Sequence, residues 1–207
     1  MGWVELETGR PDLAARTFQE LLANPAIASD PRVALTTLWG LGLARAATGA
    51  GAGAQKALDD LEARRQGLFV KPATRLSLSL SGALATNREA GQPAVADLER
   101  AASMLAPLYN TTVNPTAITI DLLARAYEVA GDLAKAREVY ERIAAMTFDR
   151  VESGATWARS FYHLGLIAER QGDKARAREQ FRKFLEIWKD ADKGLPEVAD
   201  ARKRMGQ

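Results

Sequence analysis

The sequence predicts an all-α solenoid of about five antiparallel helix pairs, closed by a C-terminal capping helix and forming a single domain over residues 1–207. Three observations lead to this prediction. The residues that dominate the composition, Ala, Leu, Arg and Glu, all favour helix. No long run is rich in Val, Ile, Thr or aromatic residues, as strands would be. A pattern of three spacings recurs every 40 to 42 residues, which indicates a repeat architecture.

The repeat is centred on five alanines, each with a small residue twelve positions before it and a large apolar residue four positions after it. The alanines are Ala14, Ala54, Ala94, Ala136 and Ala177, the small residues are Gly2, Gly42, Gly82, Ala124 and Gly165, and the large residues are Phe18, Leu58, Leu98, Tyr140 and Phe181. Small residues on both helices of a pair let the two backbones approach closely. The large residue lies on the same helix face one turn later, where it fills the gap toward a neighbour.

Turn and cap residues predict where the helices end. Gly9, Gly49, Gly131 and Gly172 stand between the two helices of four pairs, where a glycine can take the left-handed conformation. In the third pair Glu89 takes this place, and we expect a slightly different turn there. Prolines precede several apolar-periodic runs, as at first helical turns. The expected N-cap residues are Asp30, Asn114, Asp132 and Asp173.

These signals predict the elements in order, and the GAGAG stretch at 49–53 is expected to be a flexible turn. The predicted helices are 1–8, 12–23, 31–48, 54–66, 72–89, 93–108, 115–130, 133–146, 154–170, 174–190 and 196–205. They group into repeats at about 1–30, 31–71, 72–114, 115–150 and 151–192, followed by a capping helix at 195–206.

The repeated residues resemble the tetratricopeptide repeat, whose pattern is W-x2-L-G-x2-Y followed by A-x3-F. One unit reads Phe161-x2-Leu164-Gly165-x2-Ala168 with Ala177-x3-Phe181, and another reads Ile120-x2-Leu123-Ala124-x2-Tyr127 with Ala136-x3-Tyr140. The resemblance covers nearly the whole chain and is weakest in the third unit. The period exceeds the usual ~34 residues, and longer periods also belong to HEAT and armadillo solenoids. The recurring A-x3-F spacing and turn glycine favour the tetratricopeptide interpretation.

The resemblance implies a right-handed superhelix whose concave face, lined by the first helix of each pair, binds a protein or peptide. In that geometry the residues three before and one after each small residue point inward. The groove would be apolar at its early end and charged at its late end. The implied protein-binding residues are Trp39, Leu43, Ser79, Asp121, Arg125, Arg159, Tyr162 and Leu166.

No residues form a recognisable catalytic, cofactor or metal site. His163 is the single histidine, and cysteine is absent, so two-His and Cys-based metal sites are excluded. Asp59 and Asp60 are adjacent and point in different directions from a helix, and no Lys-Ser or Lys-Thr follows GAGAG at phosphate-loop spacing. We therefore expect a non-catalytic scaffold that binds a protein or peptide. A self-associating structural module and an enzyme with a helix-borne site stay open as alternatives.

Charge and hydropathy limit the cellular location of the protein and the class of its partner. The formal net charge is only +2, so nucleic acid is not an expected partner. No apolar run approaches the ~20 residues that span a bilayer, and the N-terminus lacks a signal-peptide pattern. These features predict a cytoplasmic protein without a membrane partner.

The two ends of the chain differ. The C-terminal stretch FLEIWKDADKGLPEVADARKRM is similar to the ends of repeat regions in large bacterial regulatory proteins, and its last part forms an amphipathic closing helix. The first unit has only residues 1–8 before its turn glycine, with Gly2 already at the crossing position. This predicts the C-terminal part of a larger bacterial regulatory or assembly protein, or a partner or second copy that covers residues 1–23.

Overall fold

The computed structural model describes residues 1–105, 116–146, 153–190 and 195–206. These residues form twelve α-helices and one short 3-10 helix, and no strand occurs among them. In chain order the elements are α1 (Gly2–Glu7), α2 (Pro11–Ala23), α3 (Pro25–Ser29), α4 (Pro31–Ala47), α5 (Gly51–Ala63), η1 (Gly67–Phe69), α6 (Val70–Asn87), α7 (Gly91–Ser103), α8 (Thr116–Val129), α9 (Leu133–Ala144), α11 (Gly154–Arg170), α12 (Lys174–Ile187) and α13 (Pro196–Met205). The prediction of an all-α fold is confirmed.

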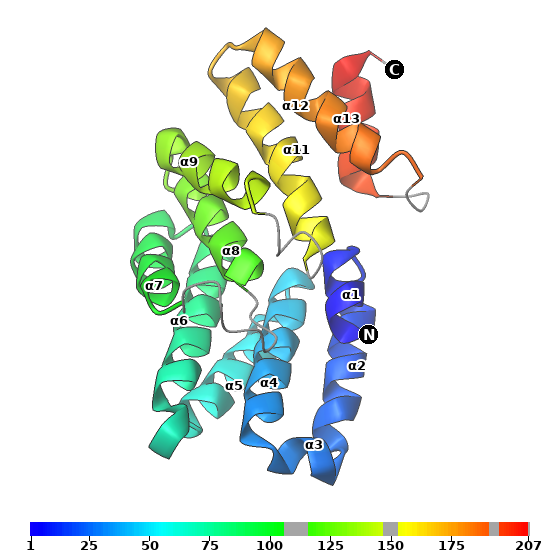
Figure 1. Ribbon diagram of the computed structural model, residues 1–207. Helices are drawn as coiled ribbons and strands as arrows, with labels where there is room; N and C mark the ends of the chain where they lie inside the picture. The colour runs from blue at the N-terminus through cyan, green and yellow to red at the C-terminus, as the bar shows by residue number, and fades with distance from the viewer. Residues whose placement is uncertain (106–115, 147–152, 191–194, 207) are drawn as a thin grey trace.

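The helices pack as successive antiparallel pairs (Figure 1). The pairs are α1 with α2, α4 with α5, α6 with α7, α8 with α9, and α11 with α12. The first member of each pair is named a first helix below, and the other a second helix. Each first helix also contacts the first helix of the next pair, so the first helices form one continuous layer. This arrangement is the predicted solenoid.

The small residues at the crossings are required by close packing. A Cβ atom added at Gly165 would lie 2.6 Å from the Phe181 ring, and one added at Gly82 would lie 2.4 Å from Leu98. At Gly42 the nearest atom belongs to Leu80 of the next first helix, at 2.3 Å. The five repeat alanines and the five large residues are all buried. The three spacings of the sequence therefore mark the points where the helices meet.

The five turns inside the pairs have one geometry, including the third. In each, the left-handed residue donates its N–H to the carbonyl three positions back, and the next residue donates to the carbonyl five positions before itself. Four of the left-handed residues are glycines, with φ between 75° and 80°. Glu89 takes the same conformation at φ 58°. The expectation of a different turn there was wrong, because the hydrogen-bond pattern of the turn holds a side-chain-bearing residue in a region that disfavours it by about 1–2 kcal/mol.

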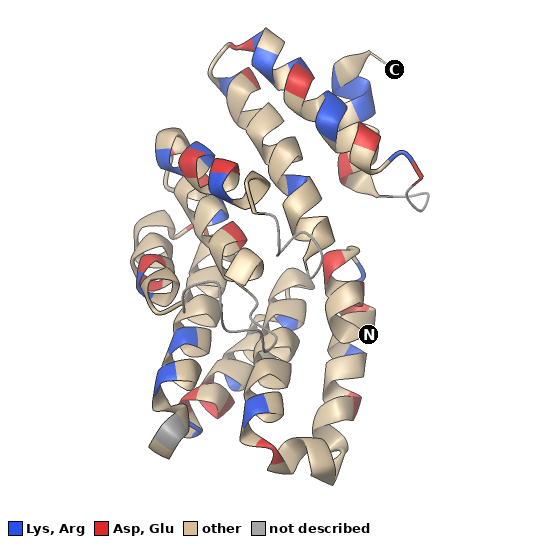
Figure 2. Ribbon diagram, in the orientation of Figure 1, with Lys and Arg blue, Asp and Glu red and all other residues tan. Residues whose placement is uncertain are grey.

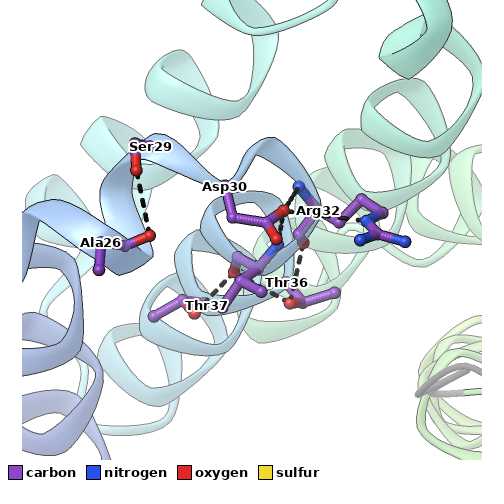
Figure 3. Close-up of polar contacts among 7 residues, drawn as sticks. Ala26, Ser29, Asp30, Arg32, Thr36 and Thr37 are labelled. Atoms are coloured by element: carbon purple, nitrogen blue, oxygen red, sulfur yellow. Dashed lines mark hydrogen bonds and ion pairs between the residues drawn. The ribbon is translucent and has the colours of Figure 1, made fainter.

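A short helix that the sequence did not predict, α3, joins α2 to α4 (Figure 3). Asn24 caps it by accepting a hydrogen bond from the Ala26 N–H. Asp30 then caps α4 by accepting from the N–H groups of Arg32 and Val33 at 2.9 and 3.4 Å. Asp132 and Asp173 cap α9 and α12 as predicted, and Asn114 lies outside the described residues. Side-chain caps thus fix where these helices begin.

The GAGAG stretch is not the flexible turn that the sequence predicted. Only Gly49 has a positive φ, and α5 already begins at Gly51. The later glycine, Gly53, lets Arg45 approach: its carbonyl accepts from Arg45 Nη1 at 3.2 Å, and an added Cβ would lie 2.9 Å from Arg45 Cδ. Helix formation and this contact together override the preference of glycine for coil.

The last helix, α13, closes the stack. Its Val198 and Ala201 are buried against Phe184 and Ala168 of the last pair. Its bounds match the predicted closing helix. No described helix combines the length and the apolar character needed to cross a bilayer.

Candidate binding groove

A cavity of about 410 Å³ lies between the first helices. All five first helices contribute to its wall, and α13 and the first turn add to it. The lining residues are Leu6, Glu7, Gly9, Leu43, Ala46, Ala47, Ala83, Asn87, Ile118, Asp121, Leu122, Arg125, Thr156, Arg159 and Glu197. This set is named the groove below. Most of its residues lie on first helices, the helices that the resemblance assigns to the concave face.

One wall of the groove is apolar and comes from α1, α4, α6 and α8. Leu43 and Ala83 follow the crossing glycines of α4 and α6 by one position and are buried at the bottom of the wall. Asn87 lies one turn after Ala83, and its side chain donates to the Ala46 carbonyl at 3.1 Å. That bond ties α6 to α4 along the groove.

The charged part of the lining comes from α1, α8, α11 and α13. Arg125 Nε lies 2.8 Å from Asp121 Oδ2, one turn away on α8, and the Arg125 side chain is 44% exposed. Arg159 Nε donates to the Glu197 carboxylate at 2.8 Å. Figure 2 shows the charged residues spread along the helices in both signs, as on a mixed surface. Within the groove each of the two arginines is paired with a carboxylate.

Arg159 also connects the two ends of the stack. Its Nη1 donates to the backbone carbonyl of Glu7, 152 residues away in the chain. Figure 1 shows the end of α1 beside the start of α11. The Arg159 side chain is only 11% exposed, and its bonds connect α1, α11 and α13 beside the groove.

Four of the eight predicted binding residues line the groove: Leu43, Asp121, Arg125 and Arg159. Two others are fully buried. Trp39 packs against Trp3 with ring centroids 5.0 Å apart, and Ser79 is 0% exposed. Their positions three before the crossing put them between the first helices, because the layer is too closely packed to expose them. In this structure neither reaches the groove.

The remaining two predicted residues, Tyr162 and Leu166, lie beneath α13. The Tyr162 hydroxyl donates to Asp200 at 2.8 Å, and burial with this hydrogen bond raises the pKa of Tyr162 to about 12. Leu166 packs in the same cluster as Val198. The closing helix therefore covers the part of α11 that these side chains would offer to a ligand. Contact with a partner stays a prediction for all eight residues.

Several groove residues were missed by the sequence reasoning, and some had a signal. Ala47 and Asn87 lie one helical turn after Leu43 and Ala83, so the same spacing rule extended by four would have found them. Glu7 and Glu197 had no such signal. They reach the groove only because the ends of the solenoid come together at Arg159.

The single histidine belongs to a structural network outside the groove. His163 stacks on Tyr140 with centroids 4.7 Å apart, and its Nδ1 lies 3.0 Å from Glu128 Oε1. The buried Tyr140 hydroxyl donates to the same carboxylate at 2.8 Å. Burial raises the pKa of Glu128, but the hydrogen bonds from His163 and Tyr140 and the charge of Arg170 outweigh it, so the net direction is downward.

Comparison with known proteins decides the family. The sequence profile described as tetratricopeptide repeat matches residues 1–67 and 122–194, more than half of the chain. The chain belongs to the tetratricopeptide-repeat family. The stretch between the two matched parts contains the third pair, where the motif departs furthest from the pattern.

A solved structure shows the same fold. The chain described as "MamA RS-1 ArsTM double mutant" is 21% identical, with a TM-score of 0.51, over 93% of this chain and 93% of that one. No curated protein matches the sequence. Tetratricopeptide-repeat domains generally act as protein-interaction scaffolds, which agrees with a groove built from every first helix.

Proposed function

We propose that this chain is a non-catalytic scaffold that binds a protein or peptide in the groove, as part of a larger bacterial regulatory or assembly protein. The observation that supports it is the groove itself: one cavity receives side chains from all five first helices. A partner lying there would contact every repeat at once. An extended concave surface of this kind is the feature that solenoids use for binding.

A blocking substitution tests the proposal without disturbing the core. Ala47 is exposed and lines the groove at the end of α4, so Ala47→Trp fills the binding space from its rim. Ala52 is equally exposed on the second helix α5 and lies outside the groove, so Ala52→Trp is the matched control. Both variants should keep the parent helical signal in circular dichroism.

The readout is capture of partners from native cell extract. Central contacts of an interface carry ~2 kcal/mol or more, so a blocked groove should lower partner recovery at least about tenfold. Ala52→Trp should recover the same proteins as the parent. Equal recovery by Ala47→Trp would move the binding site off the groove.

Self-association is a second candidate, favoured by apolar side chains exposed on the N-terminal pair and the start of α4. They are Met1, Val4, Leu13, Leu21 and Val33, with exposed fractions from 37% to 88%. Exposed apolar clusters of this kind often mark interfaces. Light scattering at increasing concentration should then show a rising mass, and the double change Leu13→Glu with Leu21→Glu should abolish the rise. Val129→Glu, at a similarly exposed site on α8, is the control.

A further inference from the structure

We propose that the groove holds an ammonium group carried on an aliphatic stem, the chemistry of a lysine side chain, with the carboxylate of Glu7 as its partner and the charge of Asp121 nearby. This inference rests on the proposed function, because it names the chemistry of what enters the groove. Four features of the groove support it: the balance of charge, the buried carboxylate of Asp121, the environment of Glu7 and the apolar part of the lining.

The charges that line the groove leave an anionic surplus. Its carboxylates are those of Glu7, Asp121 and Glu197, and its cations are Arg125 and Arg159. Each guanidinium group already has a carboxylate, Asp121 for Arg125 and Glu197 for Arg159, both at 2.8 Å. Among the described residues, no cation forms an ion pair with the Glu7 carboxylate. When Glu7 is ionised, the groove therefore carries one net negative charge.

Asp121 adds a buried negative charge that acts on Glu7. Its side chain is only 7% exposed, and Arg125 occupies Oδ2. The other oxygen, Oδ1, is buried and accepts no hydrogen bond from the part of the chain that the structure describes. A molecule the size of water does not reach Oδ1. Asp121 therefore acts on a ligand through its negative charge, which a cation in the groove offsets.

Glu7 is poised to respond to a cation. Burial raises its pKa to about 7, with a further contribution from the negative charge of Asp121. The charge of Arg159 and a hydrogen bond from the backbone of Ala155 oppose this shift and only partly offset it. Glu197 and Arg125 are the other charged groups of the lining. A cation placed beside Glu7 favours its ionised form, so binding should release a proton near neutral pH.

The apolar part of the lining suits an aliphatic stem. It is formed by Leu6, Leu43, Ala83, Ile118 and Leu122. A lysine side chain buries its methylene groups along apolar surface while its charged end seeks polar partners. The volume of about 410 Å³ falls within the ~300–1,000 Å³ of ordinary ligand pockets.

Other ligand classes fit less well. An anion would face three carboxylates while both arginines are engaged. A metal ion needs several ligands converging at short distance, and the described residues contain no group of three His, Cys, Asp or Glu side chains that could hold one. An organic cation satisfies the surplus charge without that convergence.

Heteronuclear NMR on the full chain tests the inference with defined probes. N-acetyl-lysine amide represents the side chain of a partner protein, and cadaverine represents a free amine. N-acetyl-norleucine amide has a similar stem without the charge, and N-acetyl-glutamate amide carries the opposite charge. We expect both amines to shift the resonances of groove residues. Tighter binding of the lysine amide indicates a lysine side chain of a partner protein, and tighter binding of cadaverine indicates a free amine. The norleucine and glutamate probes should bind at least about tenfold more weakly.

The pH dependence and one conservative variant identify the carboxylate. Because the pKa of Glu7 lies at about 7, its ionised fraction falls about tenfold between about pH 8 and about pH 6, and the affinity for lysine amide should fall with it. Glu7→Gln should weaken binding and remove this dependence. Glu62→Gln, an exposed site on α5 with the same change in charge, should behave as the parent.

Two outcomes overturn the inference. Equal binding of the lysine and norleucine probes would show that charge has no part, and tighter binding of the glutamate probe would reverse its sign. Failure here is separable from failure of the scaffold proposal. If Ala47→Trp loses protein partners while lysine amide does not bind the parent, the groove is a binding site without a cation pocket.

Discussion

The first three helix pairs and the last two share one fold, but they are joined by different forces. Between the early pairs the contacts are mainly apolar. Trp39, Leu35, Leu76 and Leu80 are buried in one cluster that spans α4 and α6, and Trp3 packs on it from α1. Arg32–Asp30 and Lys56–Asp60 are ion pairs within a single turn, so they do not connect one pair to the next.

The late pairs are connected by charge as well as by packing. Glu128 of α8 faces Arg170 and His163 of α11. On the second helices Glu141 pairs with Arg176, and Arg204 of α13 pairs with Glu169 of α11. The comparison shows that successive pairs of a solenoid must pack against one another. Either apolar contacts or a mixture of apolar and ionic contacts can hold them together. Four predictions follow from the difference, beginning with the largest effect.

The apolar half should be most sensitive to loss of volume. Trp39→Ala removes a fully buried side chain, which should lower the free energy of unfolding by about 3–5 kcal/mol. Urea denaturation followed by circular dichroism measures it. Val33→Ala, on the same helix but exposed, is the control and should change little. A loss below about 1 kcal/mol for Trp39→Ala would mean that the early cluster does not hold these pairs together.

The ionic half should be most sensitive to loss of an acceptor. Glu128→Ala leaves the fully buried Tyr140 hydroxyl without its partner, which should cost about 1–3 kcal/mol. Hydrogen exchange should place the loss in α8, α9 and α11, with α4 and α6 unchanged. Glu138→Ala, exposed on α9, serves as control. Uniform loosening of the whole chain would show that the two halves are not energetically distinct.

The third turn inside the pairs is expected to give a smaller change, and this change is a gain in stability. Glu89→Gly removes the strain of a side chain at the positive φ of the third turn and should raise the free energy of unfolding by about 1 kcal/mol. Glu89→Ala keeps a side chain at this φ and should bring no such gain. Thermal unfolding of the two variants side by side decides it, and equal melting temperatures would show that the turn stores no strain.

The smallest effect is that of salt. Ion pairs that are partly exposed contribute about 0–1 kcal/mol each and are screened at about 1 M salt. Amide exchange in α11, α12 and α13 should therefore quicken with salt more than exchange in α4 and α6. If salt affected both halves equally, the connections Arg176–Glu141 and Arg204–Glu169 would not contribute to holding the late pairs.

The sequence was most informative where one residue must be small or must terminate a helix. Ala136 and Gly165 could be placed because close crossings exclude larger side chains, and Asp132 because a free N–H needs a cap. These requirements are local, so they leave a spacing in the sequence. The additional helix α3 was missed although its signals are local, an Asn24 cap and a proline at the first position. The start of α5 at Gly51 was missed because the contact of Gly53 with Arg45 favours helix there over the coil preference of glycine.

The groove could be predicted only in part, for a related reason. A spacing rule shows which way a residue points but not what comes to lie over it. Leu43 and Arg125 line the groove as the rule implies, whereas Tyr162 is covered by α13 and Trp39 by its neighbours. Glu7 lies in the groove because of a contact between residues far apart in the sequence, and no local pattern could predict its position.

That contact has a mechanical consequence. An open stack of repeats behaves as a spring, because each unit touches only its neighbours and small rotations add up along its length. Arg159 ties the carbonyl of Glu7 to the start of α11, and the backbone of Ala155 donates to the Glu7 carboxylate beside it. A pull on the two termini would load these contacts as well as the stacked pairs. The module should therefore be stiff under small extensions and become compliant once these contacts break.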